Sequence, residues 1–345
     1  MMAQLAEALD TTTSGPSLPM RDAMMIAWKK ECYRSSATTS VFGITPTFIW
    51  PGTKGAGRLA IVRRYLASMR ETVRTILDRK PKTVIMLNQP PFLVAAALVA
   101  RRKHKFNMIL DFHSGALSKA AWKPFIPMYR RVVREAPFVI AHNRFDGRDL
   151  SRWGGHPVHF IALPRRFPGN LRERTADPDR ILVVCSFADD EPIEALFAAM
   201  RACPDIRFEV TGRYQKAGDA IQPVPGNVTL LGFVDYDFYL ERFATATAAA
   251  TFSTRSHIMQ MAVHEAISLG VPVVTNESET LAEVLEDAGV YCSIDPDGIA
   301  NAFRRAIAER DSLRPRARAL MERRNTTLAA ELAQLAKRAP EMFAQ

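Results

Sequence analysis

Two residues whose side chains could do chemistry stand in or directly after predicted elements. His113 follows a buried strand predicted over Met108–Phe112, and an imidazole there could orient a hydroxyl or a phosphate or act as a general base. Glu265 falls among the apolar positions of a helix predicted over Ile258–Leu269, where a carboxylate is costly unless something hydrogen-bonds to it. Each residue also has an ordinary interpretation. His113 could be a hydrogen-bonded structural histidine oriented by Asp111, and Glu265 could reach solvent from the edge of the apolar stripe.

The loop Thr254–His257 leads into this helix, and Gly270 suits the left-handed turn after it. Free amide groups at a helix N-terminus attract phosphate oxygens, and Arg255 would add a charge-assisted donor. Two turns further on, Glu265 could accept hydrogen bonds from two vicinal hydroxyls, as on a ribose. One element would then hold both the diphosphate and the ribose of a nucleotide. Arg255 could equally be a surface charge.

Polar residues and glycines also follow the other predicted strands, at the edge where open parallel sheets bind ligands. They are Arg34 after Met24–Trp28, Asn88 and Gln89 after Thr83–Leu87, Ser186 after Ile181–Cys185, Gly212 and Arg213 after Arg207–Thr211, and Gly232 and Phe233 after Val228–Leu231. The glycines could equally mark ordinary turns, because glycine tolerates backbone angles that other residues avoid. The acidic run Asp189–Glu191 is also explained by a helix start, which the helix dipole favours.

Strands alternate with helices along most of the chain, which is typical of parallel βαβ units. Late in the chain, a helix over Tyr239–Ala246 and a strand over Ala249–Phe252 are predicted. The stretch Leu163–Arg180 is rich in proline and charge, lacks periodicity and is expected to separate two domains. The predicted class is α/β, with two Rossmann-like domains facing each other across a cleft. The expected segments are a flexible N-terminus (1–22), a first domain (23–165), a linker (166–180), a second domain (181–310) and a helical tail (311–345).

Composition indicates an ordinary globular protein. The chain has 345 residues, of which 48% are hydrophobic and 24% charged, and this length favours two domains. The longest apolar run, Phe92–Ala100, is far shorter than the ~20 residues that span a bilayer, and no secretory signal is recognisable. The four cysteines are widely spaced without a CxxC pair, so we expect reduced thiols in a cytoplasmic protein and no metal site.

Charge is distributed unevenly along the chain. Residues 1–165 hold 26 Lys and Arg against 10 Asp and Glu, a net charge of +16, whereas residues 166–345 carry 20 against 26, a net charge of −6. The first half is therefore expected to face an anionic partner, such as a phosphate-bearing substrate or a membrane surface. Nucleic acid is the weakest candidate, because no nucleic-acid-binding motif accompanies the charge. The predicted helix Arg58–Arg79 is a candidate contact face, although a solvated basic helix is an equally good interpretation. Its predicted apolar face consists of Leu59, Val62, Leu66, Met69, Val73, Ile76 and Leu77.

The chain has neither a GxGxxG segment after a first strand nor a Walker A loop. Its strand-end segments instead resemble GT-B glycosyltransferases near the family 4 type. The nucleotide-sugar-binding segments of such enzymes are matched by FEVTGR (208–213), NVTLLGFV (227–234) and HEAISLGVPVV (264–274). Five further segments resemble a bacterial group of family 4-like transferases and, more distantly, the chitobiosyl-diphosphodolichol β-mannosyltransferase. They are WKKECYRSS (28–36), LNQPPF (87–92), LDFHSG (110–115), FADDEP (187–192) and TRSHIMQ (254–260). The resemblance covers most of residues 24–310.

This resemblance implies roles for single residues. Glu265 matches the ribose-binding glutamate, and His113 matches a histidine that lines the catalytic centre. Many relatives have a second glutamate near the donor sugar where this chain has His257, and the arginine and lysine that often clamp the diphosphate are missing, so Arg255 would replace them. The implied catalytic residues are His113, Arg255 and His257; the implied donor-binding residues are Ser186, Gly212, Arg213, Phe233, Thr254, Arg255, His257, Met259, Gln260 and Glu265; and the implied acceptor side is Arg34, Asn88, Gln89, His113 and Ser114.

The resemblance also implies a cytoplasmic glycosyltransferase that needs neither a metal nor a cofactor. It would transfer a sugar from a nucleotide-diphosphate sugar to a glycan or lipid-linked acceptor, in the synthesis of a cell-surface polysaccharide or glycoconjugate. The inner face of an anionic membrane is a candidate site of peripheral contact. Two alternatives stay open, namely a catalytically silent GT-B scaffold and an enzyme similar to UDP-sugar epimerases. The donor sugar, the acceptor and the stereochemical outcome stay open as well.

Overall fold

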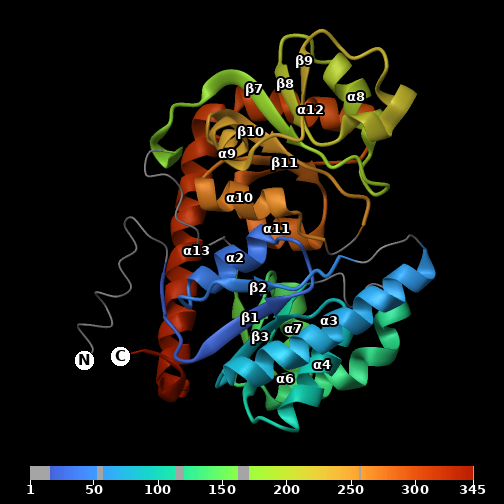
Figure 1. The fold of residues 1–345 in the computed structure, drawn as a ribbon. Coiled ribbons are helices and arrows are strands. Elements are labelled where there is room, and N and C mark those ends of the chain that lie inside the picture. Colours follow the sequence, from blue (N-terminus) through green and yellow to red (C-terminus); the bar gives the residue numbers. More distant parts are fainter. Residues whose placement is uncertain (1–15, 53–56, 114–119, 162–170, 256–257, 345) are drawn as a thin grey trace. The chain divides into compact units, whose positions relative to one another are not determined.

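The computed structural model describes residues 16–52, 57–113, 120–161, 171–255 and 258–344 (Figure 1). The chain divides into two compact units. Unit 1 comprises Met1–Arg165 and Asn325–Gln345, and unit 2 comprises Arg166–Arg324. Each unit contains one six-stranded sheet whose neighbouring strands all run parallel. Within the described residues, no helix is long and apolar enough to cross a bilayer.

The sheet of unit 1 has the strand order β2-β1-β3-β4-β5-β6. Its strands are β1 (Ala23–Ala27), β2 (Pro46–Phe48), β3 (Thr83–Leu87), β4 (Asn107–Phe112), β5 (Val139–Ala141) and β6 (Pro157–His159). Its helices are α2 (Tyr33–Ser40), α3 (Arg58–Arg79), α4 (Pro91–Arg101), η1 (Ala120–Phe125), α6 (Ile126–Glu135), α7 (Arg144–Arg152) and η5 (Pro340–Met342). The strand order reverses between β1 and β3, and ligands bind beside such switch points in doubly wound folds.

The sheet of unit 2 has the strand order β12-β11-β10-β7-β8-β9. Its strands are β7 (Asp177–Val184), β8 (Arg207–Thr211), β9 (Val228–Gly232), β10 (Ala246–Ala250), β11 (Val273–Asn276) and β12 (Gly289–Cys292). Its helices are η2 (Leu171–Glu173), α8 (Ile193–Arg201), η3 (Tyr214–Ile221), α9 (Tyr236–Ala244), α10 (Met261–Leu269), α11 (Glu279–Leu285), η4 (Glu286–Ala288) and α12 (Pro296–Ala308). Here the order reverses between β7 and β10, so the loops after these two strands lie side by side.

The last helix, α13 (Arg310–Arg338), supplies residues to both hydrophobic cores. Leu313 belongs to the core of unit 2, whereas Leu328 and Leu332 belong to the core of unit 1. The N-terminal segment was expected to be flexible up to residue 22, but Leu18 is buried and its amide donates to the carbonyl of Val41. The burial of an apolar side chain and a backbone hydrogen bond keep this segment in place.

The central strand β10 begins earlier than expected. A strand was predicted over Ala249–Phe252, with a helix ending at Ala246, whereas the strand covers Ala246–Ala250 and α9 ends at Ala244. Its sequence is ATAAA, and alanine favours helices in isolation. All five residues are buried. The strand is central in its sheet and covered on both faces, and small apolar side chains suit that position.

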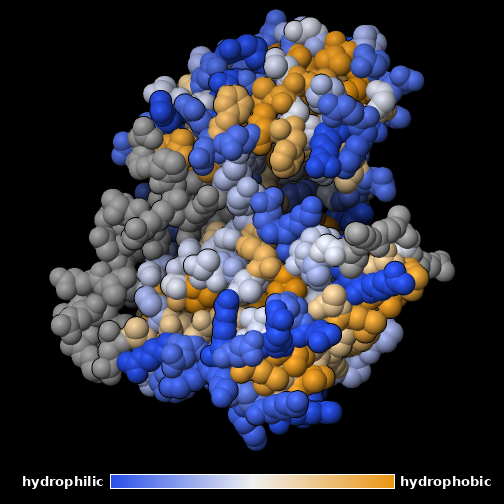
Figure 2. Space-filling model, in the orientation of Figure 1, coloured by the Kyte–Doolittle hydropathy of each residue, from blue (hydrophilic) through white to orange (hydrophobic). Residues whose placement is uncertain are grey.

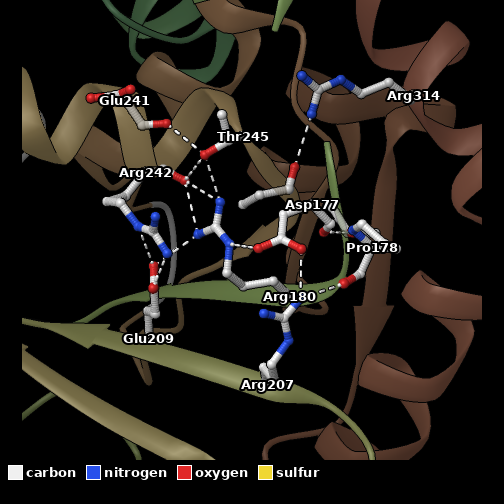
Figure 3. A network of polar contacts seen from close by, with 11 residues as sticks. Asp177, Pro178, Arg180, Arg207, Glu209, Glu241, Arg242, Thr245 and Arg314 are labelled. Atoms are coloured by element: carbon white, nitrogen blue, oxygen red, sulfur yellow. Dashed lines mark hydrogen bonds and ion pairs between the residues drawn. The ribbon is translucent and has the colours of Figure 1, made fainter. Parts of the chain in front are cut away.

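The predicted linker also ended too late. β7 begins at Asp177, and Arg180, placed in the linker by its charge, is only 2% exposed. Its guanidinium donates to Asp177 (3.2 Å), to Glu209 (2.8 Å) and to the hydroxyl of Thr245 (2.6 Å), as Figure 3 shows. Arg242 binds the same Glu209 carboxylate. A buried charge is tolerated when it is paired and hydrogen-bonded, which this network achieves.

Candidate functional site

His113 stands at the carboxyl edge of the unit 1 sheet, and the residues after β3 hold its main chain. The amide of His113 donates to Oδ1 of Asn88 (3.1 Å), and Nδ2 of Asn88 donates to the carbonyl of His113 (3.3 Å). Nε2 of Gln89 donates to the same carbonyl (3.2 Å). Asn88 is itself held, because the hydroxyl of Tyr129 donates to its carbonyl. The loop after β3 therefore fixes the position of His113 after β4.

Asp111, the penultimate residue of β4, lies between two histidines. It is fully buried, and its Oδ1 lies 2.6 Å from Nε2 of His142, the residue after β5. Its Oδ2 lies 3.4 Å from Nε2 of His113, an ion-pair distance without hydrogen-bond geometry. Nδ1 of His142 lies 3.2 Å from the carbonyl of Phe160. Both ring nitrogens of His142 thus lie at hydrogen-bond distance from oxygen atoms.

The electrostatics of this cluster keep Asp111 charged and His113 neutral. Burial alone would raise the pKa of Asp111, but the electrostatic attraction of the His113 and His142 imidazoles and the hydrogen bond with His142 hold it well below its usual range. Burial lowers the pKa of His113 to about 4; Asp111 opposes this shift, and the positive charge of Arg34 adds to it. At neutral pH, His113 is therefore a neutral imidazole that can both accept and donate a hydrogen bond.

In the described part of the chain, the side chains of Asp111, His113 and His142 form the group whose possible metal-ligand atoms all lie within 4.8 Å of one another. Two imidazoles and a carboxylate form a donor set that suits several transition metals. Their hydrogen bonds and charges already account for this arrangement, and the metal-independent site expected from the sequence stays a prediction.

In unit 2, the loops after β7 and β10 are joined through Asp190. Its Oδ2 accepts from the hydroxyl of Ser253 (2.7 Å), and its carbonyl accepts from the amide of Thr254 (2.7 Å). Its Oδ1 lies 3.4 Å from Nη2 of Arg255, whose side chain is 63% exposed. The guanidinium expected to bind a diphosphate is therefore paired with a carboxylate. Asp190, considered only as part of an acidic run, holds this loop.

Glu191 closes the loop after β7. Its carboxylate accepts from the amides of Ser186 (3.0 Å) and Ala188 (2.8 Å) and from the hydroxyl of Ser186 (3.2 Å). The acidic run therefore does more than precede a helix, and α8 itself begins only at Ile193. Ser186, expected to contact the donor, has its hydroxyl on Glu191.

Glu265 lies inside unit 2, and the interpretation that it reaches solvent is wrong. It is 3% exposed, and its two oxygens accept from the hydroxyls of Tyr236 (2.8 Å) and Tyr239 (2.5 Å), both on α9. Burial and the charge of Glu265 raise the pKa of Tyr239 well above its usual value, so this hydroxyl stays a donor. The two hydroxyls hold the carboxylate in place inside the unit.

The helix carrying Glu265 begins later than expected, at Met261, and ends at Gly270, which has φ 65° in the left-handed region as predicted. Within the described residues, no side chain caps its N-terminus. Gln260 occupies the N-cap position, and its Nε2 and Oε1 are both buried and have no hydrogen-bond partner in the part of the chain that the structure describes. A buried amide is costly to leave unpaired, so Gln260 and the N-terminus of this helix favour binding of a polar ligand there.

Three other predicted donor residues follow β8 and β9. Gly212 has φ 103°, its amide donates to the carbonyl of Gly232 (2.8 Å), and a Cβ there would lie 1.8 Å from the carbonyl oxygen of Cys185. The turn itself thus requires glycine. The guanidinium of Arg213 lies 5.6 Å from the ring centroid of Phe233, which is 80% exposed. These two side chains present an open aromatic and cationic surface.

Each half of the chain matches a model of a glycosyltransferase domain. Residues 37–166 match the glycosyl transferase 4-like domain, and residues 179–309 match glycosyl transferases group 1. The chain is a glycosyltransferase. The comparison with curated proteins finds no match.

Solved structures show that this glycosyltransferase has the GT-B fold predicted from the sequence. Sucrose-phosphate synthase from Thermosynechococcus elongatus has a TM-score of 0.66 at 14% identity, over 92% of this chain and 98% of that one. HepE from Anabaena, in complex with UDP and glucose, has a TM-score of 0.66 at 13% identity, over 92% of this chain and 100% of that one. A putative UDP-N-acetylglucosamine 2-epimerase from Listeria monocytogenes has a TM-score of 0.59 at 15% identity, over 87% and 91% of the two chains.

The structure of the glycosyltransferase brings most of the expected residues together within each unit. In unit 1, Asn88 and Gln89 contact His113, and Arg34 lies close enough to influence its pKa. Ser114 and His257 lie outside the described residues. In unit 2, Met259 is 6% exposed beside Gln260, and Thr254 contacts Asp190.

The sequence analysis did not select the residues that bind Asp111 and Glu265. His142 directly follows the short apolar strand β5, so the criterion that selected His113 would also have selected His142. Tyr236 and Tyr239 are three residues apart on one helix, but nothing local links them to Glu265.

A separate hollow of about 530 Å³ lies between the loop after β7 and η3. Asp189, Glu191 and Glu194 line it together with Lys216. Three carboxylates and one ammonium group are unsuited to a diphosphate, so we do not place the donor there.

Proposed function

We propose that this glycosyltransferase transfers a sugar from a nucleotide-diphosphate sugar to a glycan or lipid-linked acceptor, in the synthesis of a cell-surface polysaccharide or glycoconjugate. Unit 2 would bind the donor and unit 1 the acceptor. One observation carries the donor proposal. At the start of a single short helix, α10, Gln260 has no hydrogen-bond partner among the described residues, and it is followed within the helix by the buried carboxylate of Glu265. The complexes of HepE with UDP and with UDP-glucose support a nucleotide-sugar donor.

The donor would bind α10 at two places. Its phosphates would accept from the free amides at the N-terminus and from Nε2 of Gln260, where the helix dipole also favours negative charge. Its ribose hydroxyls would donate to Glu265, beside the two tyrosines. Arg255 would exchange its pairing with Asp190 for the diphosphate, since it is exposed and its present contact is 3.4 Å. The base would lie against Phe233 and Arg213.

Catalysis would rest on positioning and on stabilisation of the leaving diphosphate by α10 and Arg255. His257 would contact the donor sugar. His113, neutral at pH 7 and held by Asp111, would orient or deprotonate the acceptor hydroxyl. Both polar atoms of the Asn88 side chain bind the main chain of His113, so Asn88 is a positioning residue. Arg34 and Ser114 would contact a phosphate-bearing acceptor.

A panel of UDP-, GDP- and dTDP-sugars, including a mannose donor, tests the donor site by thermal unfolding. A donor present at a hundred times its Kd adds about 2.7 kcal/mol of stability, which raises the Tm of a domain of this size by roughly 5–10 °C. Glu265→Gln keeps an acceptor for one tyrosine but removes the charge, and Gln260→Ala removes the amide. Both variants should lose the shift, and Glu241→Gln on the exposed face of α9 should keep it.

A Tm that no nucleotide sugar raises would contradict the donor assignment. Binding without sugar transfer to any acceptor would favour a catalytically silent scaffold, and interconversion of the donor with an epimer would favour an epimerase-like enzyme. The first test of His113 is His113→Ala, which should abolish transfer and leave the donor-induced Tm shift intact.

A further inference from the structure

Helix α3 presents an apolar line of side chains on its exposed side, away from the core of unit 1. Leu59, Val62 and Leu66, which the sequence placed on one apolar face of this helix, are 62%, 52% and 61% exposed. Their spacing places them on one side of the helix. This half of the apolar face is exposed, because a different line of side chains packs inward.

The inward line of α3 begins with two polar side chains and continues with an apolar one. Ser68 and Thr72 are buried, and Thr72 accepts a hydrogen bond from Nε1 of Trp28 (2.8 Å). Ile76 continues this line and is fully buried. Since the core contacts are made by this other line, the leucines outside have no packing role within the described part of the unit.

Exposed arginines run beside the apolar stripe. They are Arg63, Arg70 and Arg74, at spacings that place them on one line of the helix. Arg74 pairs with Glu71 of the same helix (2.8 Å), and both side chains are exposed, so this contact is weak. The arrangement gives α3 an outer surface with an apolar line and a cationic line side by side.

A groove of about 590 Å³ continues this surface toward β2. Arg70, Arg74 and Arg79 line it, together with Trp50, whose side chain is 40% exposed. The guanidinium of Arg64 lies 4.7 Å from the ring centroid of Trp50. Figure 2 shows hydrophobic surface along α3 bordered by hydrophilic side chains.

We propose that this α3 surface, formed by Leu59, Val62, Leu66, Arg63, Arg70, Arg74 and Trp50, docks the protein on an anionic lipid bilayer. The leucines and the valine would enter the boundary between headgroups and acyl chains, as interfacial helices do. The arginines would bind lipid phosphates, and Trp50 would lie at headgroup depth, where tryptophan is enriched. The first 165 residues carry a net charge of +16, which complements such a membrane.

The charges decide between a bilayer and a second copy of the chain. A symmetric dimer through this face would bring two lines of arginines together, and like charges at short distance oppose association. An anionic bilayer offsets the same charges and also accepts the apolar stripe. This inference does not depend on the identity of the donor.

Co-sedimentation of the full chain with vesicles tests the proposal. The protein should bind phosphatidylcholine vesicles that contain phosphatidylglycerol, and binding should weaken with salt and without phosphatidylglycerol. The triple variant R63Q/R70Q/R74Q should lower the partition coefficient about a hundredfold. The variant L59S/V62S/L66S should lower it at least tenfold, because each apolar group lost removes buried area.

Matched changes elsewhere on unit 1 control for net charge and for surface apolarity. R102Q/K103Q/K105Q removes three exposed charges, and V99S removes a 46% exposed valine; both should bind vesicles nearly as the unchanged protein does. All variants should keep the Tm of the unchanged protein, since the altered side chains are exposed.

Three outcomes would overturn the proposal: no binding to the anionic vesicles, equal loss in the matched controls, or full binding by the stripe variant. Size-exclusion chromatography with light scattering tests the alternative that a second copy of the chain binds the α3 surface. A dimer that the stripe variant abolishes, without any vesicle binding, would assign the α3 surface to a second copy.

Discussion

Acidification from neutral pH to about pH 5 should destabilise unit 1 through His113. The imidazole is almost enclosed at the edge of the sheet, with 15% of its side chain exposed. Burial lowers its pKa from 6.5 to about 4, against the opposing effect of Asp111. The unfolded chain therefore takes up a proton at a pH where the folded protein does not.

The sign and size follow from this difference in proton binding. Stability present above pH 6.5 is lost as the pH falls toward 4, because only the unfolded state is protonated in that window. With the two pKa values cited, the loss at pH 5 is about 2 kcal/mol, and about half of that near pH 6. Asp111 stays ionised throughout this window, since its pKa lies well below the usual range.

Urea unfolding of the unchanged protein and of His113→Gln, at about pH 7.5 and about pH 5, measures the effect. All groups other than His113 are common to the two proteins, so the difference between the two pH-dependent losses isolates His113. The variant should lose about 2 kcal/mol less on acidification. Equal losses in the two proteins would refute the reasoning, as would a His113 NMR signal that titrates near its ordinary pKa.

Two further predictions concern the stability of unit 2. Glu209→Ala should cost about 3–5 kcal/mol, because it leaves the buried guanidinium of Arg180 without its closest carboxylate; urea unfolding measures this, and Glu241→Ala on the surface should be nearly neutral. Gly212→Ala should cost more than about 2 kcal/mol, because the new Cβ would meet the carbonyl of Cys185, whereas Gly226→Ala, with open space around it, should not.

Strand ends were the most predictable part of the site. Runs such as Thr83–Leu87 are apolar after their first residue, as is typical of parallel strands covered on both faces, and the structure keeps these bounds. Because all strands of each sheet run parallel, their carboxyl ends meet at one edge. The residues directly after them therefore gather without any knowledge of the loops. This explains why Asn88, Gln89 and His113 were found together.

Partners from distant elements could not be predicted. The charge of Arg180 indicated a linker, and only the packing of Glu209 and Thr245 around it makes its burial tolerable. The inward face of α3 could not be predicted for the same reason. Hydrophobic periodicity shows where the larger apolar stripe lies, whereas Ser68 and Thr72 are buried, and Thr72 binds Trp28 of a distant segment.

The burial of a charged side chain does not by itself identify the candidate site. The end of the sheet at which the charged side chain lies is more informative. Glu265 is a carboxylate held by two hydroxyl donors, Asp111 is a carboxylate that lies between two imidazoles, and Arg180 is a guanidinium held by several acceptors. All three are similarly buried. Arg180 pairs in register with Arg207, the first residue of β8, whereas Asp111 lies one residue from the carboxyl end of β4. Since ligands approach parallel sheets at the carboxyl edge, a costly polar group there favours a role in binding or catalysis, and the same chemistry at the amino end favours a structural role.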